Sequence, residues 1–318
     1  MVTELAEEII AGRRMGRKDD LSFLIEGDLE PLKQVADRIR ERLCGNHVQL
    51  CTIINGRAGR CSEDCRFCAQ SAYHHTGAQE HTILDEEALV MACHHSAEGG
   101  ARRFSVVTAG RTLSGEDFEK MLCAYQRMRR ECKEIGLCAS HGLLTEEQFA
   151  RLRENGVTMY HANIETSERN FPNICTTHTF EDKLACIRGA KKAGLLVCSG
   201  GIIGMGETWE DRLDMALTLA EYQVDSIPLN ALIPIKGTPF GELPVLTEEE
   251  IVRTIVLFRI INPTAYVRLA AGRTLMRENG REAFLAGANA AITGDMLTTS
   301  GNNMEQDRRM LLDSGFAV

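Results

Sequence analysis

The sequence lacks an excess of basic residues, a signal-peptide pattern and any apolar run long enough to cross a membrane. Its 36 Lys and Arg residues are outnumbered by 45 Asp and Glu residues, which gives a net charge of −9. This balance argues against a protein that binds nucleic acid or anionic membranes, because no basic excess is available to neutralise phosphates. The start, MVTELAEEII, is acidic, and the longest uncharged apolar stretch, Ala193–Gly206, is only 14 residues long. We therefore expect a soluble, cytoplasmic protein with no nucleic-acid or membrane partner.

The chain also lacks low-complexity tracts, Pro/Gly/Ser-rich linkers and blocks of like charge. Short β-rich segments instead alternate with longer amphipathic segments. We expect strands at Val48–Ile54, Arg103–Thr108, Gly136–Ser140, Val157–Glu165, Leu195–Ile203, Asp225–Leu232, Ala265–Leu269 and Ala288–Thr293. We expect helices near 29–43, 85–98, 115–134, 145–155, 180–193, 208–222, 247–260, 275–286 and 304–314.

Several of the expected helices have recognisable start and stop signals. Thr145–Gln148 and Thr247–Glu250 match the capping box, and Gly156 and Gly194 stand where helices should end. Eight strands separated by helices predict an α/β fold, a (β/α)8 TIM-type barrel, with an open doubly wound sheet as the alternative. We expect one compact domain made of an N-terminal helical segment (1–44), the barrel (45–300) and a short C-terminal helix (301–318). In either fold the chemistry belongs at the C-terminal ends of the strands.

The 12 cysteines are too sparse for a secreted disulfide scaffold, so they point to core packing, nucleophiles or metal ligands. Three of them, Cys61, Cys65 and Cys68, form a C-x3-C-x2-C motif just after the first expected strand. Three thiolates on one loop can hold a four-iron cluster and leave one iron open to a substrate atom. Zinc binding is the alternative, but structural zinc sites use paired C-x2-C units and no second pair follows.

This motif, with the aromatic Phe67 before its last cysteine, resembles that of the radical S-adenosylmethionine (SAM) superfamily. The resemblance implies a (β/α)8 barrel, a 4Fe–4S cluster bound by Cys61, Cys65 and Cys68, and SAM chelated by the open iron. It also implies that one electron cleaves SAM to give a 5′-deoxyadenosyl radical, which abstracts hydrogen from an unactivated C–H bond. Phe67 matches the aromatic that lies near the adenine. Gly201 and Gly204 lie in a segment that resembles the superfamily's glycine-rich SAM-binding stretch.

Further segments, in order along about 250 residues, resemble the biotin synthase family. They are Val48–Thr52, Gly59–Cys65, Ala69–Ser71, Val197–Gly201, Ile227–Asn230, Lys236–Pro239, Tyr266–Arg273, Ala286–Asn289 and Leu297–Thr299. The resemblance implies a sulfurtransferase that converts dethiobiotin to biotin by two C–H abstractions, with sulfur taken from an auxiliary iron–sulfur cluster. Another radical SAM enzyme, such as a hydrogenase-cofactor maturase or methylornithine synthase, is the alternative within the superfamily. A non-catalytic iron–sulfur redox protein is the alternative outside it.

The auxiliary-cluster residues depart from the pattern of this family. Well-known members hold a 2Fe–2S cluster with three strand cysteines and an arginine, and Cys138, Cys198 and Arg268 match three of those positions. The fourth position is Ser105, whereas Cys51 stands on the neighbouring strand where many members carry serine. Because serine is a poor iron ligand, we predict an auxiliary cluster bound by Cys51, Cys138 and Cys198. Its iron content need not be two, and three thiolates would suit a four-iron cluster that carries an extra sulfide.

Two other residues have open roles at this predicted cluster. Arg268 is either a ligand of the cluster or a hydrogen-bonding neighbour. Cys44, at the end of the leading helix, is a candidate fourth thiolate. The other cysteines, namely Cys93, Cys123, Cys132, Cys175 and Cys186, are interpreted as core or tolerated residues.

The resemblance also implies contacts to SAM and to the substrate. Asn163 and Glu165 match residues that hydrogen-bond the SAM ribose and the neighbouring substrate, and His161 replaces the family's asparagine. The backbone of Thr108, Ala109 and Gly110 would receive the methionine amino group. Candidates for the substrate's ureido ring and carboxylate are Asn163, Asn230, Thr298 and Thr299. The implied partners are a flavodoxin or ferredoxin electron donor, iron–sulfur assembly proteins and a second copy of the chain in a homodimer.

Overall fold

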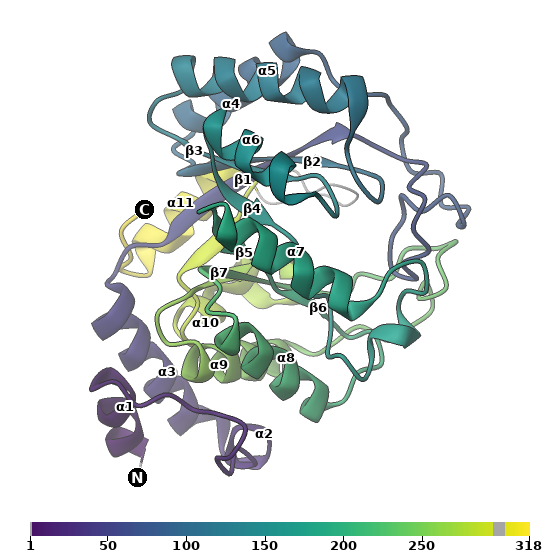
Figure 1. Ribbon diagram of the computed structural model, residues 1–318. Coiled ribbons are helices and arrows are strands. Elements are labelled where there is room, and N and C mark those ends of the chain that lie inside the picture. The colour runs from purple at the N-terminus through teal and green to yellow at the C-terminus, as the bar shows by residue number, and fades with distance from the viewer. Residues whose placement is uncertain (1, 295–302) are drawn as a thin grey trace.

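The computed structural model describes residues 2–294 and 303–318, which form a ring of parallel strands surrounded by helices (Figure 1). The strands are β1 (Gln49–Arg57), β2 (Arg103–Thr108), β3 (Gly136–Ser140), β4 (Val157–His161), β5 (Leu196–Cys198), β6 (Gly201–Ile203), β7 (Ser226–Ala231), β8 (Tyr266–Leu269) and β9 (Ala290–Ile292). The α-helices are α1 (Val2–Ile10), α2 (Phe23–Glu26), α3 (Leu29–Cys44), α4 (Glu86–Glu98), α5 (Gly115–Glu131), α6 (Glu146–Glu154), α7 (Phe180–Lys192), α8 (Trp209–Glu221), α9 (Glu248–Ile261), α10 (Arg281–Phe284) and α11 (Met304–Asp313). Short 3₁₀ turns are η1 (Phe171–Asn173), η2 (Arg273–Leu275) and η3 (Arg277–Gly280).

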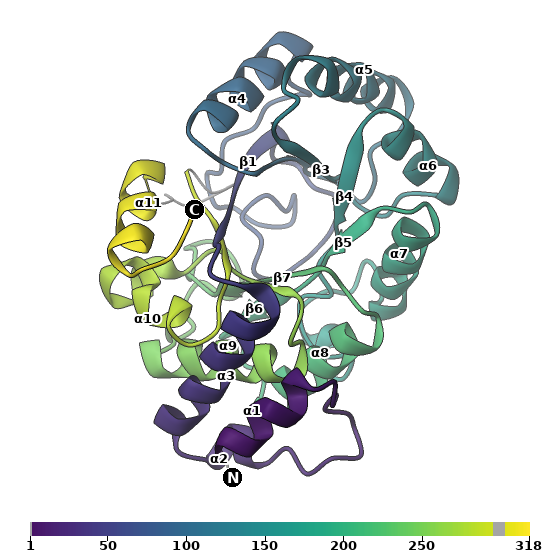
Figure 2. The ribbon, with the colours of Figure 1, turned by 90° about the vertical axis from the view of Figure 1, so that its left-hand side faces the viewer.

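The sheet closes on itself, which confirms the predicted barrel and excludes the open sheet. Its order is β5-β4-β3-β2-β1-β9-β8-β7-β6, and β5 also pairs with β7. The segments β5 and β6 are two parts of the single strand expected at Leu195–Ile203, interrupted at Ser199 and Gly200. The ring therefore has eight strand positions, and its helices lie outside it (Figure 2). Among the described residues, no helix combines the length and apolarity that a membrane span needs.

The predicted helix signals are mostly confirmed. Both capping boxes, Thr145–Gln148 and Thr247–Glu250, are present with their reciprocal hydrogen bonds. Gly156 and Gly194 end their helices with φ of 103° and 76°, a region that favours glycine. Two more boxes, at Thr179–Asp182 and Thr208–Asp211, escaped the sequence pattern because aspartate replaces the usual Glu or Gln.

Two predicted elements are wrong in extent. The helix expected near 275–286 is a pair of 3₁₀ turns followed by the four-residue α10, because Glu278 and Asn279 take left-handed φ of 46° and 53°. The strand expected at Val157–Glu165 ends at His161, and Glu165 itself has φ of 70°. Outside the barrel, α1, which the sequence pattern did not predict, packs against α3, and α3 packs against α9.

A buried histidine lies between the barrel and its outer helices. His141 is fully buried, with Thr108 Oγ1 at 3.1 Å from its Nδ1 and Tyr125 OH at 2.9 Å from its Nε2. Burial, with a smaller contribution from Arg57, lowers the pKa of His141 to about 3. The side chain is therefore neutral in the folded protein over the whole physiological range.

We expect the apoprotein to lose stability on acidification because of His141. The unfolded chain binds a proton at this side chain near pH 6.5, whereas the folded chain does so only near 3, so stability falls as the pH drops between these values. From pH 7.5 to pH 5 this residue should cost about 2 kcal/mol in the free energy of unfolding. Urea unfolding at both pH values should show a smaller loss for His141→Gln than for the unsubstituted chain. An equal loss in both proteins would contradict this assignment.

Candidate functional site

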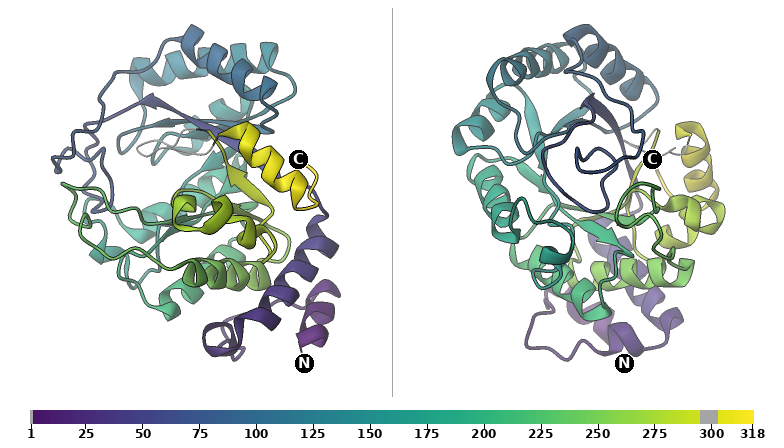
Figure 3. Two further views of the ribbon diagram at one scale, coloured as in Figure 1. Left: turned by 180° about the vertical axis from the view of Figure 1, so that it is seen from behind. Right: turned by 90° about the vertical axis from the view of Figure 1, so that its right-hand side faces the viewer.

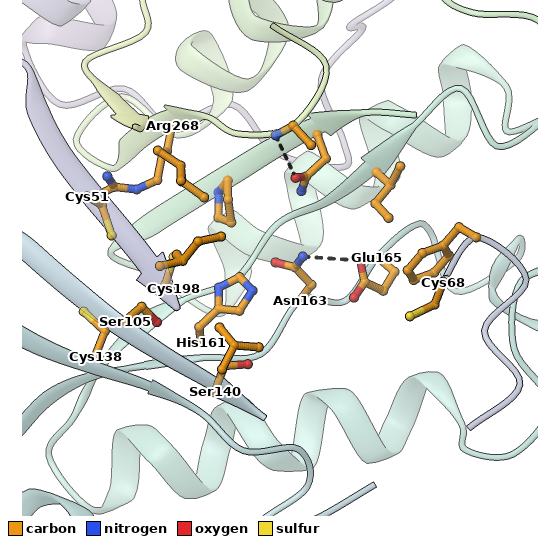
Figure 4. Close-up of a pocket in the computed structure, with 18 of the residues that line it drawn as sticks. Cys51, Cys68, Ser105, Cys138, Ser140, His161, Asn163, Glu165, Cys198 and Arg268 are labelled. Atoms are coloured by element: carbon orange, nitrogen blue, oxygen red, sulfur yellow. Dashed lines mark hydrogen bonds between the residues drawn. The ribbon is translucent and has the colours of Figure 1, made fainter. Parts of the chain in front are cut away.

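The barrel encloses one elongated cavity of about 340 Å³ that runs from the cluster loop into the strands. Side chains reach it at alternate positions of each strand, as β geometry requires. The strand residues that line it include Cys51, Ile53, Arg103, Ser105, Val107, Cys138, Ser140, Met159, His161, Cys198, Pro228, Asn230 and Arg268. At the mouth it is lined by Phe67, Cys68, Asn163 and Glu165. Figure 4 shows the two ends, with Cys51, Cys138, Cys198 and Arg268 at one and Asn163, Glu165 and Cys68 at the other.

The three strand cysteines lie together deep in this cavity. Cys51, Cys138 and Cys198 are 7%, 4% and 8% exposed. Burial raises the pKa of the Cys51 thiol to about 12, Arg268 lowers it, and the neighbouring Cys138 and Cys198 raise it. The structure thus brings together the three thiols that the sequence predicts as auxiliary-cluster ligands, and Arg268 supplies positive charge beside them.

The strand register shows where Cys51 lies relative to position 105, at which other members of the family have a cysteine. Ser105 pairs with Cys138 of β3 on one side and with Ile53 of β1 on the other. Cys51 pairs instead with Arg103, two residues nearer the N-terminal ends of the strands. Because the strands of a closed barrel are tilted, each layer of inward side chains comes from alternate strands, and the register places Cys51 of β1, Cys138 of β3 and Cys198 of β5 in one such layer, whereas Ser105 of β2 lies between layers.

All three guanidinium nitrogens of Arg268 are engaged by protein oxygens. Nε donates to Ser226 Oγ at 3.2 Å, one terminal nitrogen donates to the carbonyls of Gln49 and Ala291, each at 3.3 Å, and the other donates to Gln49 Oε1 at 2.6 Å. A guanidinium that donates at every nitrogen has no lone pair to offer a metal. These contacts favour the neighbour role over the ligand role for Arg268.

Arg103 is a lumen residue for which the sequence pattern suggested no role. A terminal nitrogen of its guanidinium lies 3.7 Å from Cys138 Sγ and 3.3 Å from Thr158 Oγ1. Its Nε is buried and has no hydrogen-bond partner among the described residues. In the sequence alone, an arginine on a strand is usually taken for a surface residue. Because Arg103 is two and four residues from Ser105 and Val107, its side chain points to the same side of β2 as theirs, into the lumen.

The C-x3-C-x2-C cysteines lie on the long loop between β1 and α4, which crosses the C-terminal mouth of the barrel (Figure 3, right). The loop is held by backbone hydrogen bonds from Cys61 N to Gln70 O at 2.8 Å and from Cys68 N to Cys65 O at 2.9 Å. Burial raises the pKa of the Cys68 thiol to about 11, and the nearby Cys61 and Glu165 add to the increase. The loop therefore holds its cysteines by main-chain contacts that do not depend on the thiols.

Cys175, interpreted from sequence as an unremarkable loop residue, contacts one of these cysteines. Its Sγ lies 3.7 Å from Cys65 Sγ and 3.3 Å from His178 Nδ1. The hydrogen bonds from Cys65 and from His178 are the main causes that lower the pKa of the Cys175 thiol, to about 4. No spacing rule links residues 65 and 175, so the sequence alone gave no signal of this contact.

Asn163 and Glu165 follow β4 at the mouth of the cavity. Asn163 Oδ1 accepts a hydrogen bond from Gly200 N at 3.0 Å, and Asn163 Nδ2 donates to Glu165 Oε2 at 3.3 Å. Burial raises the pKa of Glu165, while Lys183 and Asn163 oppose the increase. Asn230, on β7, donates to Gly201 O at 3.1 Å and accepts from Ala271 N at 3.1 Å. Backbone groups at the strand ends thus orient Asn163 and Asn230, and Asn163 in turn contacts the Glu165 carboxylate.

Other predicted contacts lie away from the cavity. Thr108 faces His141, whereas Ala109 and Gly110 line a separate hollow, and Ala109 O already accepts two hydrogen bonds from Arg57. Gly204 N donates to Glu207 Oε1 at 2.8 Å.

Cys44 Sγ lies at 3.4 Å from Arg259 and 3.5 Å from Pro263 O, outside the lumen, so its suggested role as a fourth thiolate lacks support. Thr298 and Thr299 fall outside the described residues.

Two family models match the chain. The radical SAM superfamily model matches residues 57–219, which contain both the cluster loop and Asn163, Glu165 and Cys198. The Biotin and Thiamin Synthesis associated domain model matches residues 228–317, which contain Asn230 and Arg268.

Curated relatives match over nearly the whole chain. A biotin synthase of Alkaliphilus metalliredigens is 59% identical over 99% of both chains, and one of Clostridium beijerinckii is 58% identical over the same share. A biotin synthase of Akkermansia muciniphila is 46% identical over 100% of this chain and 98% of its own.

Solved structures share the fold at much lower sequence identity. Methylornithine synthase has a TM-score of 0.84 at 18% identity and covers 98% of this chain and 96% of its own. The FeFe-hydrogenase maturase HydG from Carboxydothermus hydrogenoformans has a TM-score of 0.76 at 15% identity and covers 99% of this chain and 78% of its own. These two likenesses show the barrel fold alone, while the family models and the full-length sequence matches show the family. The chain belongs to the biotin synthase family of radical SAM enzymes.

Proposed function

We propose that this chain converts dethiobiotin to biotin, with one iron–sulfur cluster at the mouth of the barrel and a second, sulfur-donating cluster in its lumen. The observation that carries the proposal is that one cavity has cysteines at both ends. Cys68 of the loop motif lines its mouth, and Cys51, Cys138 and Cys198 line its interior. A substrate lying between them would face a radical source on one side and a sulfur source on the other.

The loop cysteines suit a SAM-binding four-iron cluster. Cys61, Cys65 and Cys68 provide three thiolates, which leave one iron open. When bound and reduced, this cluster with SAM would supply the 5′-deoxyadenosyl radical that abstracts hydrogen. Phe67 lines the cavity next to Cys68 and would contact the adenine, and the Asn163–Glu165 pair would accept hydrogen bonds from the ribose.

The lumen cysteines suit a cluster larger than 2Fe–2S. Three thiols are present on the alternate strands β1, β3 and β5, and position 105 on β2, where other members of the family have a cysteine, carries serine. A four-iron cluster held by Cys51, Cys138 and Cys198 would keep one iron without a protein ligand, and an extra sulfide at that iron would be the sulfur delivered to the substrate. Arg103 and Arg268 would offset the negative charge of such a cluster.

Arg268→Met is expected to retain the auxiliary iron and sulfide. Because its guanidinium is engaged by Ser226, Gln49 and Ala291, the substitution removes hydrogen bonds and charge but no ligand. It should cost about 1–3 kcal/mol in stability, because the buried oxygens that Arg268 bonds are left without their donor. Iron and sulfide analysis with a thermal unfolding curve checks both parts, and Arg268→Lys is the milder companion variant. Loss of the auxiliary iron from both folded variants would show that Arg268 is a ligand.

Glu165→Gln is expected to weaken SAM binding by about 10- to 100-fold, the effect of replacing a charged hydrogen-bond acceptor. Glutamine keeps the size of the side chain and its contact with Asn163, so the loop geometry should persist. Equilibrium binding of SAM to the reconstituted protein measures the change, and Glu168→Gln, three residues along the same segment and outside the cavity lining, is the matched control. Equal affinity in Glu165→Gln and the control would remove Glu165 from the SAM site.

The proposed function is tested with reconstituted protein under anaerobic conditions, reduced by dithionite and supplied with SAM. We expect 5′-deoxyadenosine and biotin when dethiobiotin is present. If 5′-deoxyadenosine forms but dethiobiotin is neither consumed nor required, the chain is another radical SAM enzyme. If neither product forms although both clusters are loaded, the chain is a redox protein.

This function requires substrate contacts and protein partners. Asn230, Thr298 and Thr299 would contact the substrate's ureido ring and carboxylate. Flavodoxin or ferredoxin would deliver the electron, iron–sulfur assembly proteins would rebuild the auxiliary cluster, and the enzyme would act as a cytoplasmic homodimer. Size-exclusion chromatography with light scattering tests the dimer directly.

A further inference from the structure

Where the cluster loop meets the segment before α7 lies a group of three side chains of metal-ligating types, of which Cys65 alone belongs to the C-x3-C-x2-C motif. Cys65 comes from the loop, and Cys175 and His178 come from the segment between η1 and α7. One ligand atom from each of the three residues lies within 4.8 Å of the other two. Cys65 Sγ and Cys175 Sγ are 3.7 Å apart, and His178 Nε2 is 3.8 Å from Cys175 Sγ.

These separations are those of ligands that share one ion. A tetrahedral site with bonds of ~2.3 Å to sulfur and ~2.0 Å to nitrogen places its ligand atoms roughly 3.5–3.8 Å from one another. Thiolates that bind different irons of a cubane have no such restriction. The two separations measured from Cys175 Sγ thus fit a mononuclear site.

His178 is held by a carboxylate in the manner typical of a metal ligand. Glu63 Oε2 lies 2.6 Å from His178 Nδ1, and Glu63 is only 7% exposed. The contact holds the proton on Nδ1, which also lies 3.3 Å from Cys175 Sγ, and leaves Nε2, 3.8 Å from that sulfur, as the ring nitrogen that can bind an ion. The two segments are joined independently of these side chains, because Asp64 accepts from Thr176 N at 2.8 Å.

We propose that Cys65, Cys175 and His178 form a binding site for one divalent transition-metal ion, such as Fe²⁺, in protein that lacks the cluster at the loop. Two thiolates and an imidazole suit Fe²⁺, Zn²⁺ and Co²⁺, and the fourth position stays open to water. Binding displaces one proton from each thiol and changes no oxidation state.

The site shares Cys65 with the proposed SAM cluster, so the ion and the cluster exclude each other. An Fe²⁺ held here is already attached to one cysteine of the loop, and assembly of the cluster would transfer Cys65 from the single ion to the cubane. This exclusion rests on the proposed function, whereas binding of the ion by cluster-free protein does not.

The test is titration of reduced, cluster-free protein with Co²⁺ under anaerobic conditions, followed by the sulfur-to-cobalt charge-transfer absorption. We expect one equivalent to bind with this absorption, and Cys175→Ala to weaken its affinity by at least ~10-fold, since even outer-sphere changes cost that much. Cys175→Ser is the variant of similar size. Cys186→Ala, a buried cysteine on α7 that contacts Gly142 O instead, is the matched control and should bind as the unsubstituted chain does.

Cys51→Ser separates this site from the lumen thiols and should leave the Co²⁺ titration unchanged. The proposal is overturned if the unsubstituted protein gives no charge-transfer absorption, or if both Cys175 variants bind Co²⁺ as tightly as Cys186→Ala. Once the loop cluster has been reconstituted, added Co²⁺ should no longer give the sulfur-to-cobalt absorption. If the absorption still formed, the ion and the cluster would not exclude each other. Formation of 5′-deoxyadenosine by the reconstituted protein tests the proposed function separately, because it needs the cluster and not this ion.

Discussion

Cys68→Ala is expected to abolish 5′-deoxyadenosine formation while the barrel stays folded and the lumen cluster stays in place. The thiol lines the mouth of the cavity, and with two thiolates left the loop cannot hold a cubane that keeps an open iron. Activity should fall by about three orders of magnitude or more, because no side chain of the site can generate a radical in its place. Anaerobic assay of 5′-deoxyadenosine and biotin checks the loss.

The loop should survive the change because its backbone is held without the thiol. Cys68 N donates to Cys65 O, and Cys68 O accepts from His74 Nδ1 at 2.9 Å. Cys93→Ala, which removes a fully buried thiol in α4, is the matched control and should keep both products at a cost of about 1–2 kcal/mol in stability. If Cys68→Ala retained more than a trace of 5′-deoxyadenosine formation, the assignment of the loop cluster would be wrong.

Cys51→Ser is expected to separate the two halves of the chemistry. It removes a thiol next to Cys138 and Cys198 but touches nothing at the mouth, so 5′-deoxyadenosine formation should continue while biotin formation falls by at least ~100-fold. The side chains differ by one atom and Cys51 is 7% exposed, so the barrel should tolerate the substitution. Quantifying both products in the same reaction measures the separation.

A double variant sharpens this test. Cys51→Ser with Ser105→Cys restores three lumen thiols, now in the register that pairs position 105 with Cys138. We expect it to regain an auxiliary cluster, because position 105 also lines the cavity and pairs with Cys138. Full biotin formation by the single variant Cys51→Ser would show that Cys51 is not a ligand.

Local sequence signals predicted the barrel and drew attention to the loop at its mouth. Thr145 and Thr247 start helices because their hydroxyls cap free backbone amides, a contact within four residues that a sequence shows directly. The C-x3-C-x2-C loop is equally local. Predicting that Cys51, Cys138 and Cys198 face the lumen required two further arguments. One was the family resemblance, and the other was the alternation of side chains along three separate strands.

Contacts between distant segments could not be predicted in this way. Cys175 meets Cys65 because the segment after β4 packs on the cluster loop, and no periodicity encodes that approach. Arg103 is inside because of the barrel's closure, although arginine is rarely buried. The prediction of a helix near 275–286 was wrong because the spacing of apolar residues does not show the left-handed backbone at Glu278 and Asn279, which interrupts a helix.

The central claim is that two clusters occupy the two ends of one cavity and that Cys51 holds the inner one. Mössbauer spectroscopy with iron and sulfide analysis, on the reconstituted unsubstituted protein and on Cys51→Ser, tests it most directly. Two four-iron clusters predict about eight irons per chain in the former and about four in the latter, with only the loop cluster's signal retained. Equal iron content and identical spectra in the two proteins would contradict the claim.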